Sequence, residues 1–91
     1  LAMLEDVELT GASLRRARLA RAKLVRARAE RACFDEADLT RCDLAQARLA
    51  RASFLRARLE SASLEGAVAE HAAFDDADLT KLRASEGARF T

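Results

Sequence analysis

The 91-residue sequence contains no proline, tryptophan or tyrosine, and it has only three glycines, two cysteines and one histidine. Two cysteines are too few for the disulfide framework of a small secreted domain, so we expect a reducing, cytoplasmic setting. Charged residues make up 34% of the chain, which excludes a membrane span, and the hydrophobic fraction of 51% excludes a low-hydrophobicity disordered chain. We find no glycine-rich phosphate loop, nucleophile elbow or zinc-ligand spacing, so we expect no enzyme and no cofactor.

Basic and acidic residues are unevenly distributed, although the net charge is only +1. Residues 11–31 contain eight basic side chains and one acidic side chain, whereas residues 60–80 contain six acidic and no lysine or arginine side chains. We therefore expect the molecule to be electrically polar from end to end.

A large apolar residue recurs at every fifth position from Leu4 to Leu79, with alanine at two of these sixteen positions. Alanine usually stands two residues earlier, and the residue between them is usually polar. This order of small inward, polar outward and large inward is the alternation of a β-strand. In an α-helix, by contrast, a five-residue step turns each apolar side chain by about 140° and forms no single apolar face.

Units such as 37–41 (ADLTR) and 77–81 (ADLTK) match the pattern A-(D/N)-L-x-x, and on these residues the chain resembles the pentapeptide-repeat family. The resemblance covers residues 2–81. It implies an all-β fold, a right-handed quadrilateral parallel β-helix of about four coils, with the alanine and leucine or phenylalanine columns inside. We place this β-helix at residues 1–81 and an irregular coil end, or a bulge before a further repeat, at 82–91.

Residues twenty positions apart support a twenty-residue coil. Phe34, Phe54 and Phe74 share this spacing. Two outward columns alternate in charge, and because neighbouring opposite charges stabilise paired strands, we predict salt-bridge ladders in them. These columns are Arg18, Asp38, Arg58, Asp78 and Arg16, Glu36, Arg56, Asp76. We expect Arg18, Asp38 and Arg58 to be exposed and the following side chains to be buried: Leu24, Phe34, Leu39, Leu44, Leu49 and Phe54.

Few residues are candidates for a chemical site. His71, Cys33 and Cys42 are interpreted as structural or incidental, and they provide no catalytic, cofactor or metal site. The acidic groups 35–38 and 75–78 are interpreted as parts of the charge ladders. The candidate partner-binding residues are the arginines gathered on one side of the expected coil, Arg28, Arg31, Arg48 and Arg51.

Three functions compete. The leading hypothesis is a non-enzymatic structural or protein-interaction module, which binds an unknown protein partner or associates end to end. We expect it not to bind nucleic acid, since no aromatic side chains interleave the arginines. We also expect no membrane partner, since 34% of the residues are charged. The alternative comes from the resemblance: some family members mimic DNA, bind gyrase and confer antibiotic resistance, but a net charge of +1 disfavours mimicry of a polyanion. A catalytic or small-molecule site is the third.

The sequence starts at Leu1, and Arg89, Phe90 and Thr91 stop inside a repeat motif. We therefore expect a processed chain or a fragment of a longer protein.

Overall fold

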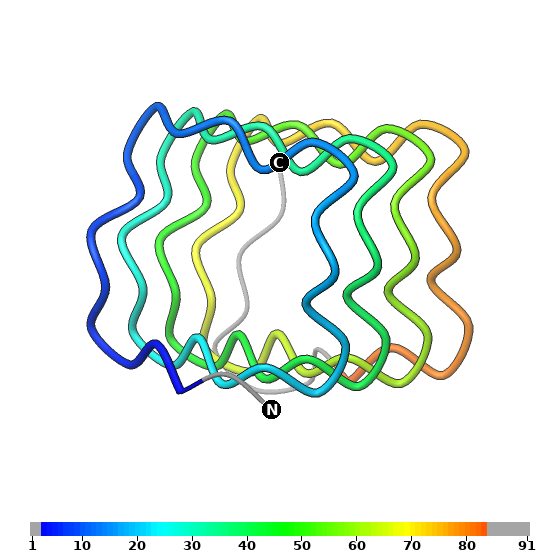
Figure 1. Cartoon of the computed structure of the whole chain (residues 1–91), viewed down its shortest axis with the longest axis horizontal. Helices are drawn as coiled ribbons and strands as arrows, with labels where there is room; N and C mark the ends of the chain where they lie inside the picture. The colour runs from blue at the N-terminus through cyan, green and yellow to red at the C-terminus, as the bar shows by residue number, and fades with distance from the viewer. Residues whose placement is uncertain (1–2, 84–91) are drawn as a thin grey trace.

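The computed structural model describes residues 3–83, and these residues wind into coils that lie side by side (Figure 1). This part of the chain contains no helix and no extended strand, because its pairing consists of isolated parallel β-bridges. Each bridge joins residues twenty positions apart, as in Arg18 with Asp38 and Asp38 with Arg58. One coil therefore takes twenty residues, as the phenylalanine spacing predicts.

Each coil has four sides of one pentapeptide each, which we name A to D. Side A comprises 3–6, 22–26, 42–46 and 62–66; side B comprises 7–11, 27–31, 47–51 and 67–71; side C comprises 12–16, 32–36, 52–56 and 72–76; side D comprises 17–21, 37–41, 57–61 and 77–81.

A tight turn at the end of each pentapeptide makes the corner. The first amide of the next unit donates to the carbonyl of the large apolar residue, as in Ala27 to Leu24 at 3.0 Å. The last residue of the unit has a positive φ, for example 61° at Arg31, while the residue before it does not. One positive φ at the third turn position defines a type II β-turn. Most corners tolerate this conformation without glycine, because the corner amide is held by the next coil, as in Arg31 to Ala50 at 2.9 Å.

Three further amides of a typical unit bond to adjacent coils. On side A, Leu24 donates to the carbonyl of Asp43 at 2.7 Å, Arg26 donates to Ala45 at 2.9 Å, and Asp43 donates back to Ala22 at 2.9 Å. With Glu65 and Glu70 left aside, the fourth residue of each unit is the exception, since its amide has no backbone acceptor among the described residues. Four of five backbone donors are thus satisfied by the coil itself.

Acidic side chains satisfy several of these remaining amides. The Asp38 carboxylate accepts from the Thr40 amide at 3.1 Å and from its hydroxyl at 2.7 Å, and Asp78 bonds to Thr80 in the same way. These bonds from Thr40, and more weakly the charges of Arg58 and Arg18, lower the pKa of Asp38. In the D-L-T pattern, the aspartate therefore supplies an acceptor for the one amide that has no backbone acceptor in the coil.

The interior holds the predicted columns. All six side chains predicted to be buried have 0% exposure. Phe34, Phe54 and Phe74 stack, with ring centroids 4.9 Å apart and planes inclined by 4° at each step, which matches the spacing of paired strands. Arg18 and Arg58 are exposed as predicted. The prediction for Asp38 is wrong, because its bonds to Thr40 hold it against the coil, half-buried.

The boundary at residue 81 stays a prediction. Leu82 and Arg83 continue the regular path, since the Arg83 amide donates to the carbonyl of Ala62 at 2.9 Å. The rest of the predicted irregular end, 84–91, lies outside the described residues.

Asp35 provides a test of side-chain bonding at the corners. Its carboxylate accepts from the Ser53 hydroxyl and from the Leu55 amide at 3.0 Å, which lowers its pKa. A lowered pKa stabilises the fold above about pH 4, and this contribution is lost as the pH falls through the folded value. We expect Asp35→Ala to lower the free energy of unfolding by about 1 kcal/mol at pH 7, and by less at pH 3.

The matched control is Asp75→Ala, at the same corner position, where the carboxylate forms no hydrogen bond with another described residue. Urea unfolding at both pH values measures the difference. Equal effects of the two substitutions at pH 7 would show that the Asp35 bonds contribute nothing.

Candidate binding surface

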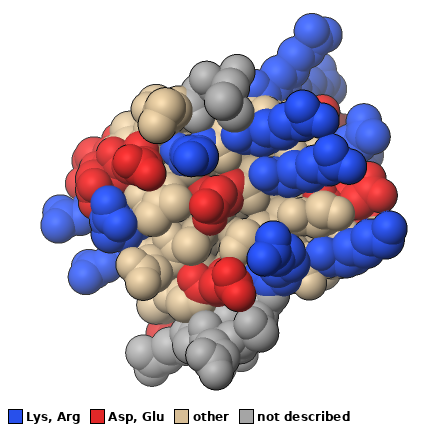
Figure 2. Space-filling model, turned by 90° about the horizontal axis from the view of Figure 1, so that it is seen from below, with Lys and Arg blue, Asp and Glu red and all other residues tan. Residues whose placement is uncertain are grey.

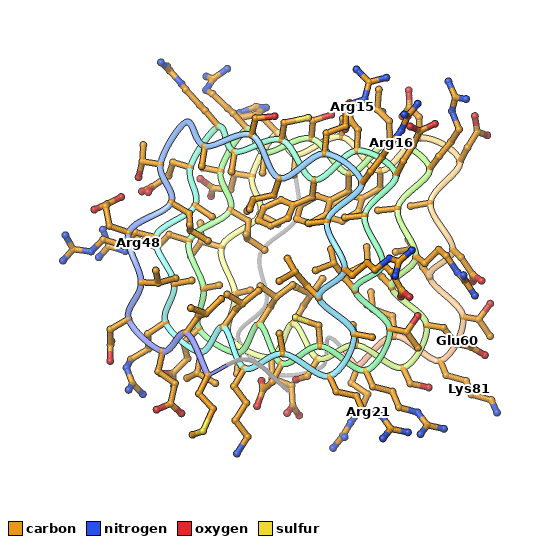
Figure 3. The ribbon with its side chains drawn as sticks, viewed as in Figure 1. Arg15, Arg16, Arg21, Arg48, Glu60 and Lys81 are labelled. Carbon is orange, nitrogen blue, oxygen red and sulfur yellow. The ribbon has the colours of Figure 1, made fainter. Side chains whose placement is uncertain are left out.

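The four candidate arginines lie together on side B, as the twenty-residue coil predicts. Arg28 and Arg48 occupy the middle of this side on adjacent coils, and Arg31 and Arg51 occupy its corner. All four are exposed. We call them the side B quartet. Arg48 points away from the interior, on the opposite side of the coil from Arg21 and Lys81 (Figure 3).

The quartet places like charges next to each other. Arg28 and Arg48 are paired in a parallel β-bridge, and the Arg31 amide bonds to Ala50, next to Arg51. Like charges directly opposite on neighbouring strands are destabilising. Electrostatic repulsion between the stacked arginines therefore destabilises side B, and neutral or acidic residues at these positions would remove it.

Few acidic groups compensate the quartet. Arg28 approaches Glu8 at 4.0 Å, with both side chains more than 60% exposed. Within residues 3–83, Arg31, Arg48 and Arg51 form no ion pair. Positive charge is thus available to a partner at three of the four positions.

One of the two predicted charge ladders forms ion pairs. Glu36 lies between Arg16 at 2.9 Å and Arg56 at 3.7 Å, and Arg15 approaches it at 3.9 Å. The hydrogen bond from Arg16, followed by the arginine charges, lowers the pKa of Glu36. The column of Arg16, Glu36, Arg56 and Asp76 carries no net formal charge, in contrast to the side B quartet.

The other predicted ladder alternates in charge without close pairs. Arg18, Asp38, Arg58 and Asp78 are neighbours through β-bridges, but no ion pair within 4.0 Å joins them. Both aspartates instead accept hydrogen bonds from the threonine two residues later. The prediction of a salt-bridge ladder is wrong for this column, because a local hydroxyl competes with the more distant guanidinium.

A hollow of about 320 Å³ lies beside the quartet, where side A meets side B. It is lined by Asp6, Arg26, Arg28, Gln46 and Arg48. Asp6 accepts two hydrogen bonds from Arg26, at 2.8 and 3.0 Å, which lower the pKa of Asp6. One wall of the hollow is thus formed by the ion pair of Asp6 and Arg26, and the other includes Arg28 and Arg48 of the quartet.

Sequence reasoning missed Asp6, Arg26 and Gln46. Asp6, Arg26, Gln46 and Gly66 share one corner column, so the twenty-residue spacing contained the signal. At Gly66, an added Cβ would come within 3.2 Å of the Gln46 Cγ, and its φ of +70° favours glycine. The glycine therefore leaves room for the Gln46 side chain at the edge of the hollow.

The remaining candidates are a histidine and two cysteines. His71 is exposed at the corner of side B, one coil beyond Arg51 in the same column. Cys42 is buried on side A, where desolvation and then the charge of Asp43 raise the pKa of its thiol to about 12. Cys33 is half-buried on side C, and both thiols are free. The two cysteines therefore lie apart from the quartet and the hollow.

The described part of the chain contains no group of three histidine, cysteine or acidic side chains placed to hold a metal ion. No helix in this part has the length and apolar character needed to cross a membrane. Figure 2 shows the side A view, in which lysine and arginine side chains gather along one edge and acidic side chains are scattered among the rest. That face therefore presents mixed charge.

Solved structures share the fold. The chain aligns over 99% of its length, at a TM-score of 0.97 and 24% identity, with 61% of a pentapeptide repeat protein from the cyanobacterium Cyanothece 51142. It aligns over 96%, at a TM-score of 0.51 and 34% identity, with 38% of HetL, a pentapeptide repeat protein involved in heterocyst differentiation regulation in Nostoc. It aligns over 87%, at a TM-score of 0.50 and 24% identity, with 62% of a pentapeptide repeat protein from the Arabidopsis thaliana thylakoid lumen. The chain thus spans less than two thirds of each of these proteins.

No curated protein matches the chain. The family model for pentapeptide repeats matches residues 2–41 and 42–80, with eight copies, which is nearly the whole chain. Its matched units are those whose apolar columns fill the interior and whose polar residues form the corners. The chain therefore belongs to the pentapeptide-repeat family.

Proposed function

We propose that the chain is a non-enzymatic protein-interaction module, a rigid right-handed quadrilateral β-helix of about four coils that works in the cytoplasm. Its side B quartet contacts a protein partner. The observation that carries the proposal is the adjacency of Arg28 and Arg48, two like charges that the fold does not require. The free thiols of Cys33 and Cys42 support a reducing compartment.

Rigidity supports a scaffold role. Each coil is bonded to its neighbours through three amides per unit, and the interior of the middle coils is fully buried. A partner that binds such a preformed surface orders few groups on the module's side, which reduces the entropy cost of association. Pentapeptide-repeat proteins generally act as structural or interaction modules, and HetL is involved in a regulatory process.

The surface gives less support to the competing functions. Mimicry of DNA needs a predominantly negative surface, but the chain has a net charge of +1 and the quartet is basic. Binding of single-stranded nucleic acid uses outward aromatic rings, whereas Phe34 and Phe54 are buried. Catalysis needs several positioned acid, base or nucleophilic groups, whereas His71 is an exposed corner residue and the chain's single histidine.

The quartet can be tested with two variants of equal charge. In the first, Arg28, Arg31, Arg48 and Arg51 are replaced by glutamine; in the second, Arg15, Arg18, Arg21 and Arg41 are replaced. We expect proteins captured from the source cells by the native chain to be lost with the first variant and retained with the second. Circular dichroism checks that both variants fold. Equal loss with both would show that only net charge matters.

Self-association is a second candidate, favoured by the first coil. Among the described residues, the amides of Glu8, Ser13 and Arg18 have no backbone acceptor, although the corresponding amides one coil later are bonded. Leu14 and Leu19 are also only half-buried. Open edges of this kind pair readily with another chain. The basic excess of residues 11–31 and the acidic excess of residues 60–80 give such a contact a head-to-tail direction.

Sedimentation at low and high salt tests this candidate. We expect concentration-dependent association at 0.01 M salt that weakens at 1 M, because the Debye length falls from about 30 Å to about 3 Å. A chain that stays monomeric at high concentration and low salt would rule the contact out.

A further inference from the structure

We propose that the hollow beside Arg28 and Arg48 is a carboxylate-binding site, and that an acidic segment of the protein partner docks there. The inference rests on the proposed function and names the chemistry of its partner. Four observations carry it: the shape of the hollow, its charge, a break in the charge pattern of side B, and the acidic groups around the quartet.

The hollow has room and donors for acidic side chains. Its volume of about 320 Å³ exceeds the space of a single carboxylate group. Arg28 and Arg48 face it from adjacent coils, one strand spacing apart. Planar guanidinium groups bind carboxylates through paired hydrogen bonds, so two stacked guanidinium groups can hold one carboxylate between them. The Gln46 amide at the rim adds a neutral donor.

The charges in the hollow leave it positive. Asp6 is neutralised by its two hydrogen bonds with Arg26. Glu8 offsets Arg28 only partly, because it lies 4.0 Å away and both side chains are exposed. Arg48 has no ion pair among residues 3–83. An incoming carboxylate therefore meets the uncompensated guanidinium of Arg48. It also reduces the electrostatic repulsion between Arg48 and Arg28.

The column that contains these arginines departs from the alternation seen on side D. It runs Glu8, Arg28, Arg48, Val68, whereas the corresponding column of side D alternates in sign at every step. An acidic residue at position 48 would continue the alternation and stabilise the coil. Local conflicts with the fold of this kind are expected where function selects the residue.

The surroundings favour protein carboxylates over a nucleic-acid backbone. Glu30 lies within the quartet's own pentapeptide, between Arg28 and Arg31 in sequence, and Glu8 lies beside Arg28. A continuous row of phosphates would be repelled by these acids, whereas a protein segment can place single carboxylates at Arg48 and Arg51 and basic or neutral residues beside the acids.

Two charge reversals of equal size separate this site from a net-charge effect. Arg48→Glu places an acid next to Arg28, and Arg58→Glu places an acid between Asp38 and Asp78. We expect Arg48→Glu to raise Tm by about 1–5 °C and Arg58→Glu to lower it by a similar amount. Isothermal titration with a hexaglutamate peptide at low salt then measures binding. We expect Arg48→Glu to weaken it by at least about tenfold and Arg58→Glu to change it by less than about twofold.

Each other outcome overturns the proposal. Equal loss with both variants means that the peptide responds to net charge, and no loss with Arg48→Glu means that it binds elsewhere. A hexathymidylate oligonucleotide that binds as tightly as hexaglutamate and is lost with Arg48→Glu assigns the site to phosphates. If the native chain captures its cellular partner through the quartet but does not bind hexaglutamate, the proposed interaction function stands and the proposal of a carboxylate-binding site is wrong.

Discussion

Backbone hydrogen bonding between residues about twenty positions apart is the constraint on which the rest of the structure depends. The bond from Leu24 to Asp43, and its equivalents on every side, fix the rise from coil to coil. Stacking at that rise brings the rings of Phe34 and Phe54 to 4.9 Å. Within each coil, alanine positions alternate with large apolar positions, so alanine and leucine fill separate interior columns rather than a helix face. Helix propensity, which favours alanine, leucine and arginine, is overridden because five-residue spacing leaves a helix with no apolar face to bury.

The same stacking determines how the surface charges act. Every outward side chain has neighbours one coil away, so a single substitution changes two contacts. Glu36 between Arg16 and Arg56 uses this geometry for stability. Arg48 and Arg28 are like charges on adjacent coils, so the same geometry lowers stability there and leaves positive charge available to a partner. The same columns of side chains therefore determine both stability and binding, and the side B quartet is a place where the two requirements conflict.

The repetition of the sequence predicted most of the fold. Residues that stand twenty positions apart stack on each other, and this spacing is visible in the sequence alone. It determines the columns, the buried residues, the phenylalanine stack and the gathering of the quartet. Two features were not predicted, because both depend on where a side chain turns. Asp38 bonds to Thr40 instead of Arg58, and Asp6 pairs with Arg26 to form one wall of the hollow. Local hydrogen bonds of this kind compete with ladder contacts, and spacing alone does not rank them.

Hydrogen exchange at single-residue resolution tests the coil most directly. In the middle coils, the amides of Val25, Ala50 and Glu60 have no backbone acceptor among the described residues, so they should exchange rapidly while their chain neighbours are protected. Thr40 and Leu55, whose amides donate to aspartates, should exchange more slowly than these three. This five-residue pattern across the middle coils is the predicted result. Continuous protection through 22–61, as in a helix, would contradict it.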